Sequence, residues 1–166
     1  MVLHIGILTI SDRSARGQRA DASGPSLAEA VRAQGWIVEQ MDIVPDEREI
    51  IEETLRMWSD TGKANVILTT GGTGFSPRDV TPEATQAVIE RQTPGLAEAM
   101  RQTSLLVTPY AMLSRAIAGI RKRTLIVNLP GSPKAALENF KVILPVLSHA
   151  AQLLDEDPQA EADHNR

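Results

Sequence analysis

The chain has 166 residues, a formal net charge of −4, 42% hydrophobic and 23% charged residues, which is typical of one soluble globular domain. It contains no cysteine, which excludes disulfides, thiolate zinc sites and a cysteine nucleophile. The acidic balance without a long basic run argues against a nucleic-acid partner. No apolar run approaches the roughly 20 residues of a membrane span, and no signal peptide is evident, so we expect a cytoplasmic protein without a membrane partner.

Apolar runs alternate with helical patterns along the chain. Strands are expected at 3–10, 36–44, 66–69 and 124–129, and helices at 25–34, 46–59, 82–91, 95–105 and 133–153. Pro145 is expected to kink or divide the last helix, and residues 116–125 are typical of a short β excursion. The alternation predicts an α/β fold with a mostly parallel sheet covered on both faces. We expect one domain over 1–154 and a disordered polar tail over 155–166.

Polar loops follow each of the expected parallel strands. They are Ser11-Asp12, Pro45-Asp46, Gly71-Gly72-Thr73-Gly74 and Pro130-Gly131-Ser132. Parallel strands bring these loops to one edge of the sheet, where open α/β folds bind ligands. Helix N-termini meet at the same edge, and their free N–H groups favour anions. The pattern therefore predicts a phosphate or carboxylate ligand.

The sequence Gly71-Gly72-Thr73-Gly74 opens a polar segment that continues to Asp79, and we call residues 71–79 the glycine loop. Glycines permit positive φ and let backbone N–H groups approach a phosphate. A tight turn would explain a lone pair of glycines, but the length and polarity of this segment favour ligand binding. The segment is neither a dinucleotide fingerprint, because Pro77 stands where a third glycine belongs, nor a Walker P-loop.

Three of these loops carry a carboxylate: Asp12, Asp46 and Asp79. Magnesium on a polyphosphate takes one or two carboxylates together with phosphate oxygens and water. Structural alternatives exist, because Asp46 with Glu49 resembles a capping box and Asp12 could cap its own turn. Asp79 has no evident capping partner and is therefore the least explained by structure.

Hydroxyl and basic side chains complete the set of candidates. Thr81 and Ser132 each precede a proline and are expected to be helix N-caps. Phosphate contacts could come from Arg115, Lys134 and the basic run 121–123. For the run 121–123, a solvated turn is the favoured interpretation.

With these motifs in view, the chain resembles the molybdopterin adenylyltransferase family, which includes bacterial MogA and MoaB proteins and the G domains of gephyrin and its plant counterpart. The most specific match combines Gly71-Gly72-Thr73-Gly74 with Arg78-Asp79-Val80-Thr81-Pro82-Glu83-Ala84. Further matching stretches run in the family's order from about Leu3 to Ala150. They are Ile10-Ser11-Asp12-Arg13, Asp21-Ala22-Ser23-Gly24-Pro25, Val44-Pro45-Asp46-Glu47, Leu113-Ser114-Arg115 and the segments 100–104 and 128–134.

The resemblance implies a three-layer αβα fold of the MogA/MoaB type, usually assembled as a homotrimer. It implies that ATP and Mg²⁺ are used to transfer AMP to the phosphate of molybdopterin, with release of pyrophosphate. It also implies that a separate molybdate-insertion enzyme completes the cofactor, because no such domain is fused to this chain.

The resemblance also implies roles for individual residues. Asp46 and Asp79 match the family's essential acids, and from the carboxylates themselves we expect both to hold Mg²⁺. Nucleotide and phosphate binding is expected at Ser11, Asp12, Gly71, Gly72, Thr73, Gly74, Thr81 and Glu83. Molybdopterin binding is expected at Ser104, Ser114, Arg115, Asn128, Pro130, Gly131, Ser132 and Lys134.

Two alternatives stay open. The chain could be a MoaB-like, non-catalytic pterin-binding scaffold, or a nucleotide pyrophosphatase of the competence-damage-related type. The MoaB branch often departs at the equivalents of Pro45-Asp46 and Arg78-Asp79. This chain keeps both pairs, which favours the MogA-like interpretation.

Overall fold

The computed structural model describes residues 1–156, so nearly all of the expected tail lies outside the described residues. Six strands form one sheet in the order β2-β1-β3-β6-β5-β4. They are β1 (His4–Ile10), β2 (Ile37–Val44), β3 (Val66–Thr70), β4 (Arg91–Gln92), β5 (Ala118–Arg121) and β6 (Thr124–Leu129). Strands β2, β1, β3 and β6 are parallel, and β5 pairs antiparallel with both β6 and β4. The expected mostly parallel sheet and the β excursion before β6 are both confirmed.

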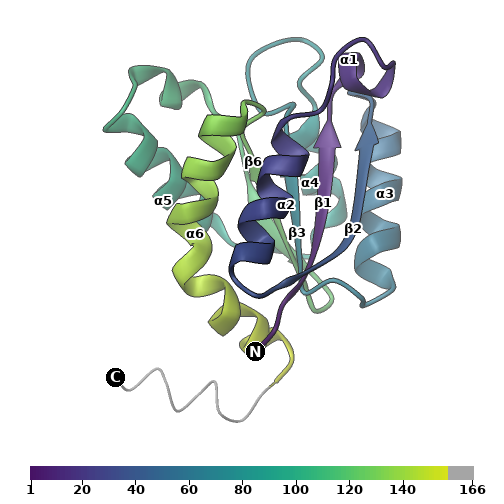
Figure 1. Ribbon diagram of the computed structural model, residues 1–166, viewed down its shortest axis with the longest axis vertical. Coiled ribbons are helices and arrows are strands. Elements are labelled where there is room, and N and C mark those ends of the chain that lie inside the picture. Colours follow the sequence, from purple (N-terminus) through teal and green to yellow (C-terminus); the bar gives the residue numbers. More distant parts are fainter. Residues whose placement is uncertain (157–166) are drawn as a thin grey trace.

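Helices cover both faces of this sheet (Figure 1). They are α1 (Asp12–Ala15), α2 (Ser23–Ala33), α3 (Arg48–Asp60), α4 (Thr81–Val88), α5 (Pro94–Leu105), the 3-10 helix η1 (Pro109–Leu113) and α6 (Pro133–Leu154). One core cluster joins the sheet to α2, α5 and α6, and a second joins it to α3 and α4. The three-layer αβα fold is therefore confirmed.

The central strands contribute to both clusters because successive side chains point to opposite faces. In β1, Ile5 and Ile7 lie in the first cluster, whereas Leu8 and Ile10 lie in the second. All five residues of β3 and all six of β6 are buried. Burial on both faces explains why these strands read as continuous apolar runs in the sequence.

Most helix bounds shift by one or two residues from expectation, and two larger differences stand out. The last helix is not divided, because α6 continues through Pro145 to Leu154. Pro145 lies on the exposed side, where water can satisfy the carbonyl group that loses its N–H donor, while Ile143 and Leu147 are buried against the sheet. Helix α4 ends at Val88 rather than 91, because Arg91 and Gln92 pair with β5 instead.

The strand order reverses between β1 and β3, since β2 lies on one side of β1 and β3 on the other. The loops that follow β1, β2, β3 and β6 therefore meet at one edge of the sheet.

None of the helices within residues 1–156 combines the length and apolarity that a membrane crossing needs.

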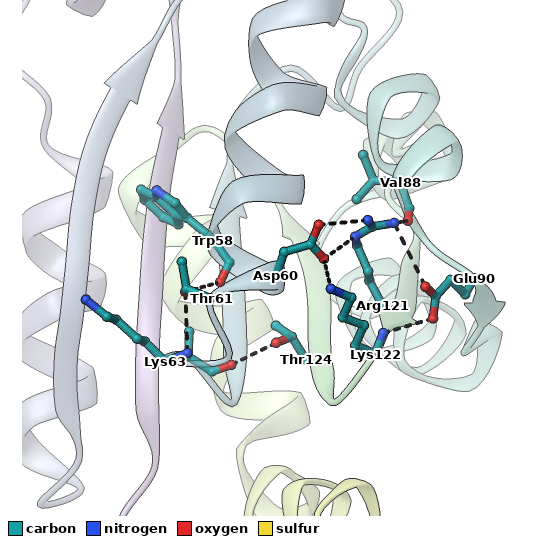
Figure 2. Close-up of polar contacts among 10 residues, drawn as sticks. Trp58, Asp60, Thr61, Lys63, Val88, Glu90, Arg121, Lys122 and Thr124 are labelled. Atoms are coloured by element: carbon teal, nitrogen blue, oxygen red, sulfur yellow. Dashed lines mark hydrogen bonds and ion pairs between the residues drawn. The ribbon is translucent and has the colours of Figure 1, made fainter.

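The basic run 121–123 lies at the opposite edge, in the turn between β5 and β6 (Figure 2). The Arg121 guanidinium donates two hydrogen bonds of 3.0 Å to Asp60 and one of 3.2 Å to the Val88 carbonyl oxygen. Lys122 also pairs with Asp60, at 2.9 Å. Lys122 and Arg123 are exposed in this turn, as the solvated-turn interpretation predicts, whereas Arg121 ends β5 with a paired side chain that is 19% exposed. The run lies away from the loops that carry the glycines.

Candidate functional site

A pocket of about 360 Å³ opens at the loop edge beside β1 and β3, and we call it the first pocket. Its walls bring together many of the residues expected to bind nucleotide or metal. The lining includes Ser11, Asp46, Gly71, Gly72 and Asp79, together with Gly131 and Ser132. All four strand-end loops therefore contribute to one polar cleft. The loop after β2 contributes through Asp46.

Asp46 is fixed by a reciprocal contact with Asp12. The backbone N–H of Asp12 donates to the Asp46 carboxylate at 2.8 Å, and the backbone N–H of Asp46 donates to the Asp12 carboxylate at 3.0 Å. The capping-box interpretation of Asp46 is wrong, because α3 begins at Arg48 and its N-cap, Glu47, makes no side-chain cap. Asp12 does not cap its own turn either, since Ser11 accepts the hydrogen bond from the Ser14 N–H.

Arg78 extends this contact to the glycine loop. Its guanidinium donates to both carboxylate oxygens of Asp12 at 3.0 Å and to Glu47 at 2.7 Å. The hydrogen bond from Arg78 lowers the pKa of Asp12 below its ordinary value. Arg78 therefore joins the loops that follow β1, β2 and β3. Its hydrogen bonds go to Asp12 and Glu47 and not to Asp46.

Burial raises the pKa of Asp46, and the neighbouring charges of Asp12 and Asp79 raise it further. One Asp46 oxygen would lie 3.1 Å from a Cβ built on Gly72, so this carboxylate stands directly against the glycine loop. Asp79 lines the same pocket and accepts a hydrogen bond from the Ser76 N–H at 3.0 Å. That contact gives Asp79 a structural role that the sequence did not reveal.

The donor set of the first pocket fits Mg²⁺ held jointly by protein and phosphate. Within residues 1–156, no group of three or more acidic or histidine side chains could hold a metal alone. The charge of Asp79 adds to the cost of ionising Asp46, and a dication would relieve that cost. Mg²⁺ bound to a polyphosphate needs only one or two carboxylates.

Two positions of the glycine loop require glycine. Gly71 and Gly72 have φ values of 106° and 66°. A Cβ on Gly71 would lie 2.2 Å from the Ile10 carbonyl oxygen, and one on Gly72 would lie 2.3 Å from the Thr81 hydroxyl oxygen. Neither contact is sterically possible, so the backbone here passes closer to its neighbours than any side chain allows.

Thr81 anchors the start of this loop rather than capping a helix. Its buried hydroxyl donates to the Gly71 carbonyl oxygen at 2.9 Å, and its N–H donates to the Gly72 carbonyl oxygen at 3.1 Å. The expectation of an N-cap at Thr81 is therefore wrong, and Val80 occupies that position without a side-chain bond. The same expectation for Ser132 is confirmed, since its hydroxyl accepts from the Ala135 N–H.

A second pocket of about 270 Å³ lies on the other side of the glycine loop. Its walls include Thr73, Gly74, Ser104, Ser114 and Pro130, and its surface is more apolar than that of the first pocket. Val107, Tyr110 and Leu113 supply apolar surface, while Arg101 and Asn139 supply polar groups. Three residues expected to bind molybdopterin thus meet here, whereas Gly131 and Ser132 lie in the first pocket.

Asn128 is fully buried, so direct contact with a ligand, as expected from the sequence, does not fit this structure. Its amide nitrogen donates to the hydroxyls of Thr69 and Thr85 at 3.0 and 2.9 Å. Its carbonyl oxygen accepts from the Ile117 N–H at 3.2 Å. Asn128 therefore joins β6 to β3 and α4 beneath the loops instead of facing a pocket.

Five further residues of the expected set line neither pocket: Asp12 and Thr81, whose contacts are described above, and Glu83, Arg115 and Lys134. Arg115 pairs with Glu83 and donates to the carbonyl oxygens of Gly74 and Asp79 at 2.8 and 2.7 Å. Burial opposes ionisation of Glu83, but the hydrogen bond from Arg115, a backbone hydrogen bond and the charges of Arg115 and Arg48 together lower the pKa of Glu83. Lys134 has an 82% exposed side chain, 3.9 Å from Glu138. Arg115 thus contacts the glycine loop directly, and Glu83 holds the Arg115 guanidinium.

Several lining residues of the first pocket were missed as site residues. They are Thr9, Arg19, Asp21, Ser23 and Thr70. Asp21 accepts hydrogen bonds from the Thr9 hydroxyl at 2.7 Å and from the Gly24 N–H at 3.1 Å. The motif Asp21-Ala22-Ser23-Gly24 is visible in the sequence, but it follows no strand directly, so the strand-end argument does not reach it.

Comparison with known proteins agrees with this arrangement. Residues 6–149 match the family described as "Probable molybdopterin binding domain". The chain is 46% identical to gephyrin of Dictyostelium discoideum over 94% of its own length, but it spans only 23% of that protein. It is 40% identical to molybdopterin adenylyltransferase of Helicobacter pylori, with 92% of this chain and 88% of that protein covered. The solved structure of the molybdopterin biosynthesis enzyme MoaB from Thermus thermophilus superposes with a TM-score of 0.88 at 48% identity, covering 95% and 99% of the two chains.

Proposed function

The chain belongs to the family of probable molybdopterin binding domains, and from that premise we propose that it is a molybdopterin adenylyltransferase. In this reaction the terminal phosphate of molybdopterin takes AMP from ATP, and pyrophosphate leaves. The name of the Helicobacter pylori relative supports the assignment. The observation that carries it is the pair of pockets on opposite sides of one glycine loop, with the carboxylates of Asp46 and Asp79 in the first.

The two pockets differ in the chemistry that they can accept. The first is polar, and backbone groups of Gly71 and Gly72 lie in its wall beside the carboxylates of Asp46 and Asp79. This environment suits the triphosphate of ATP. The second pocket combines apolar walls with hydroxyl groups at Ser104 and Ser114, which suits a flat heterocycle that also carries hydrogen-bonding groups.

Mg²⁺ would be held by Asp46 and Asp79 together with the ATP phosphates. When bound, the ion would neutralise negative charge on the triphosphate and orient its α-phosphorus. The hydrogen bond from the Asp12 N–H fixes one Asp46 oxygen and the one from the Ser76 N–H fixes one Asp79 oxygen. Both carboxylates are thus held in place before any ligand arrives, so little reorganisation is needed on binding.

Bond making and breaking then take place above the glycine loop. A phosphate oxygen of molybdopterin in the second pocket attacks the α-phosphorus of ATP in the first, and the bond from that phosphorus to the bridging oxygen of the β-phosphate breaks. The electron pair leaves with pyrophosphate. The role of the chain is positioning and charge stabilisation, which dominate in reactions of this type.

Product analysis tests the proposal directly. The purified chain is incubated anaerobically with ATP, Mg²⁺ and molybdopterin, and adenylyl-molybdopterin and pyrophosphate are quantified. We expect the two products in equal amounts, and only when all three components are present. Pterin binding without product would instead indicate a scaffold, and release of AMP and pyrophosphate from ATP alone would indicate a pyrophosphatase.

We also propose a cytoplasmic homotrimer that passes its product to a separate molybdate-insertion enzyme. Apolar side chains available for contact between copies are exposed around the end of α5 and η1. Leu106 is 87% and Tyr110 76% exposed. Figure 1 shows this part of the chain standing away from the sheet.

A further inference from the structure

Arg115 lies at the junction of the two pockets. Its backbone N–H donates to the Thr73 carbonyl oxygen at 2.8 Å, and its side chain donates to the carbonyl oxygens of Gly74 and Asp79. A further guanidinium nitrogen pairs with Glu83 in the first turn of α4. Arg115 therefore holds the glycine loop at two places. These are Thr73 and Gly74, which line the second pocket, and Asp79, which lines the first.

The second pocket reaches Arg115 through its immediate neighbours. Ser114 precedes Arg115 and lines that pocket, as do Thr73 and Gly74. Arg101, from α5, lines the same pocket and donates to the carbonyl oxygens of Ser114 and Ala116 at 3.4 and 2.7 Å. A ligand in the second pocket would thus touch groups that are one peptide unit or one hydrogen bond away from Arg115.

The first pocket reaches Arg115 through Asp79. The carbonyl group of Asp79 is bonded to Arg115, while the carboxylate of the same residue lines the first pocket. The orientation of that carboxylate depends on the backbone between Gly74 and Asp79, and Arg115 holds both ends of this segment. Arg115 itself lines neither pocket.

We propose that Arg115 is a positioning residue that couples the two pockets, so that molybdopterin in the second strengthens binding of Mg²⁺–ATP in the first. The inference rests on the proposed function. The physical basis is that Arg115 holds both ends of the loop segment shared by the two pockets, so the arrangement of this segment that one ligand favours is also the one presented to the other ligand. Coupling of this kind acts equally in both directions.

Calorimetric titration measures the coupling without turnover. The probe is Mg²⁺ with α,β-methylene-ATP, whose α,β bridge cannot be cleaved, titrated anaerobically with and without saturating molybdopterin. For the unaltered chain we expect binding to tighten at least about fivefold when molybdopterin is present. In Arg115→Gln this ratio should fall close to one, because the guanidinium contacts with Gly74, Asp79 and Glu83 are lost together.

Arg121 offers a matched control. It also makes paired hydrogen bonds to a carboxylate and one to a carbonyl oxygen, but at the opposite edge of the sheet (Figure 2). Arg121→Gln should therefore keep the ratio of the unaltered chain. Thermal unfolding of each variant checks that the fold is retained.

The outcomes separate this inference from the proposed function. A folded Arg115→Gln variant that binds both ligands with the original ratio would overturn the coupling role, as would a ratio of one in the unaltered chain. If Arg115→Gln does not fold, Arg115→Lys decides: a reduced ratio supports the role, and an unchanged ratio overturns it. Failure of the unaltered chain to bind either ligand would overturn the proposed function, and the coupling with it.

Discussion

The backbone amides of Asp12 and Asp46 each donate a hydrogen bond to the other residue's carboxylate, at 2.8 and 3.0 Å. The turn after β1 and the turn after β2 therefore hold one another in place. One carboxylate is stabilised by Arg78, whereas the other faces the first pocket and has a raised pKa. The pair thus divides into a supporting residue, Asp12, and a residue available for a ligand, Asp46.

Asp46→Asn should reduce adenylyl transfer by about 10²–10³-fold, because it removes a charge that acts in the transition state. Folding should be retained, since the asparagine carbonyl oxygen can still accept from the Asp12 N–H. Initial rates and urea unfolding measure the two effects. Asp42→Asn is the control, because Asp42 is exposed on β2 and its carboxylate accepts a hydrogen bond from the adjacent Ile43 N–H. Normal turnover by Asp46→Asn would contradict the role given to Asp46.

Asp79→Asn should separate binding from chemistry. Adenylyl transfer should again fall by orders of magnitude, because charge neutralisation acts mainly in the transition state. Molybdopterin binding should persist, since Ser104, Ser114 and Pro130 lie in the second pocket. Pterin binding and product formation are measured on the same preparation. Normal turnover, or joint loss of binding and activity in a folded variant, would show that this division of roles is wrong.

Gly72→Ala should abolish most activity and lower the free energy of unfolding by about 1–3 kcal/mol. The added methyl group would meet the Thr81 hydroxyl and the Asp46 carboxylate, and φ is positive at this position. Gly95→Ala is the matched control, because a Cβ there meets nothing within 4 Å and the residue lies in α5. Urea unfolding and the initial rate of adenylyl transfer are measured for both variants. Equal free energies of unfolding would contradict the close approach at Gly72.

Asp60 should contribute stability that depends on pH. Hydrogen bonds from Arg121 and Lys122 lower the pKa of Asp60 from 3.8 to about 2 (Figure 2). Because the folded-state pKa is depressed, the contribution is complete above pH 3.8 and is lost as the pH falls toward 2. Asp60→Asn should therefore lower the Tm at neutral pH, and the difference from the unaltered chain should narrow between pH 4 and 2. A difference that stays constant over this range would refute the assignment.

Light scattering tests the assembly. We expect a homotrimer at micromolar concentration, as the resemblance to the molybdopterin adenylyltransferase family implies. A stable monomer under these conditions would refute the trimer.

Much of the fold could be predicted because its central strands are buried on both faces and leave long apolar runs in the sequence. Predictions from local motifs failed where a polar group hydrogen-bonds to a residue distant in the sequence. Thr81-Pro82 and Ser132-Pro133 carry the same N-cap motif, yet only Ser132 caps its helix, because the Thr81 hydroxyl bonds to Gly71. The resemblance assigned Asn128 and Arg115 to ligand binding, but the surrounding chain occupies their polar groups in this structure. Such contacts depend on tertiary geometry, which the spacing of residues does not encode.

The wall between the two pockets is a single thickness of backbone, since Gly72 lines one pocket and the next residue, Thr73, lines the other. Successive Cα atoms are only about 3.8 Å apart. A joined product would therefore occupy both pockets at once, and each half would hold the other at a high effective concentration. Its residence time should exceed that of either substrate alone. Product release would then limit the turnover rate, and a downstream acceptor that removes the product would raise that rate.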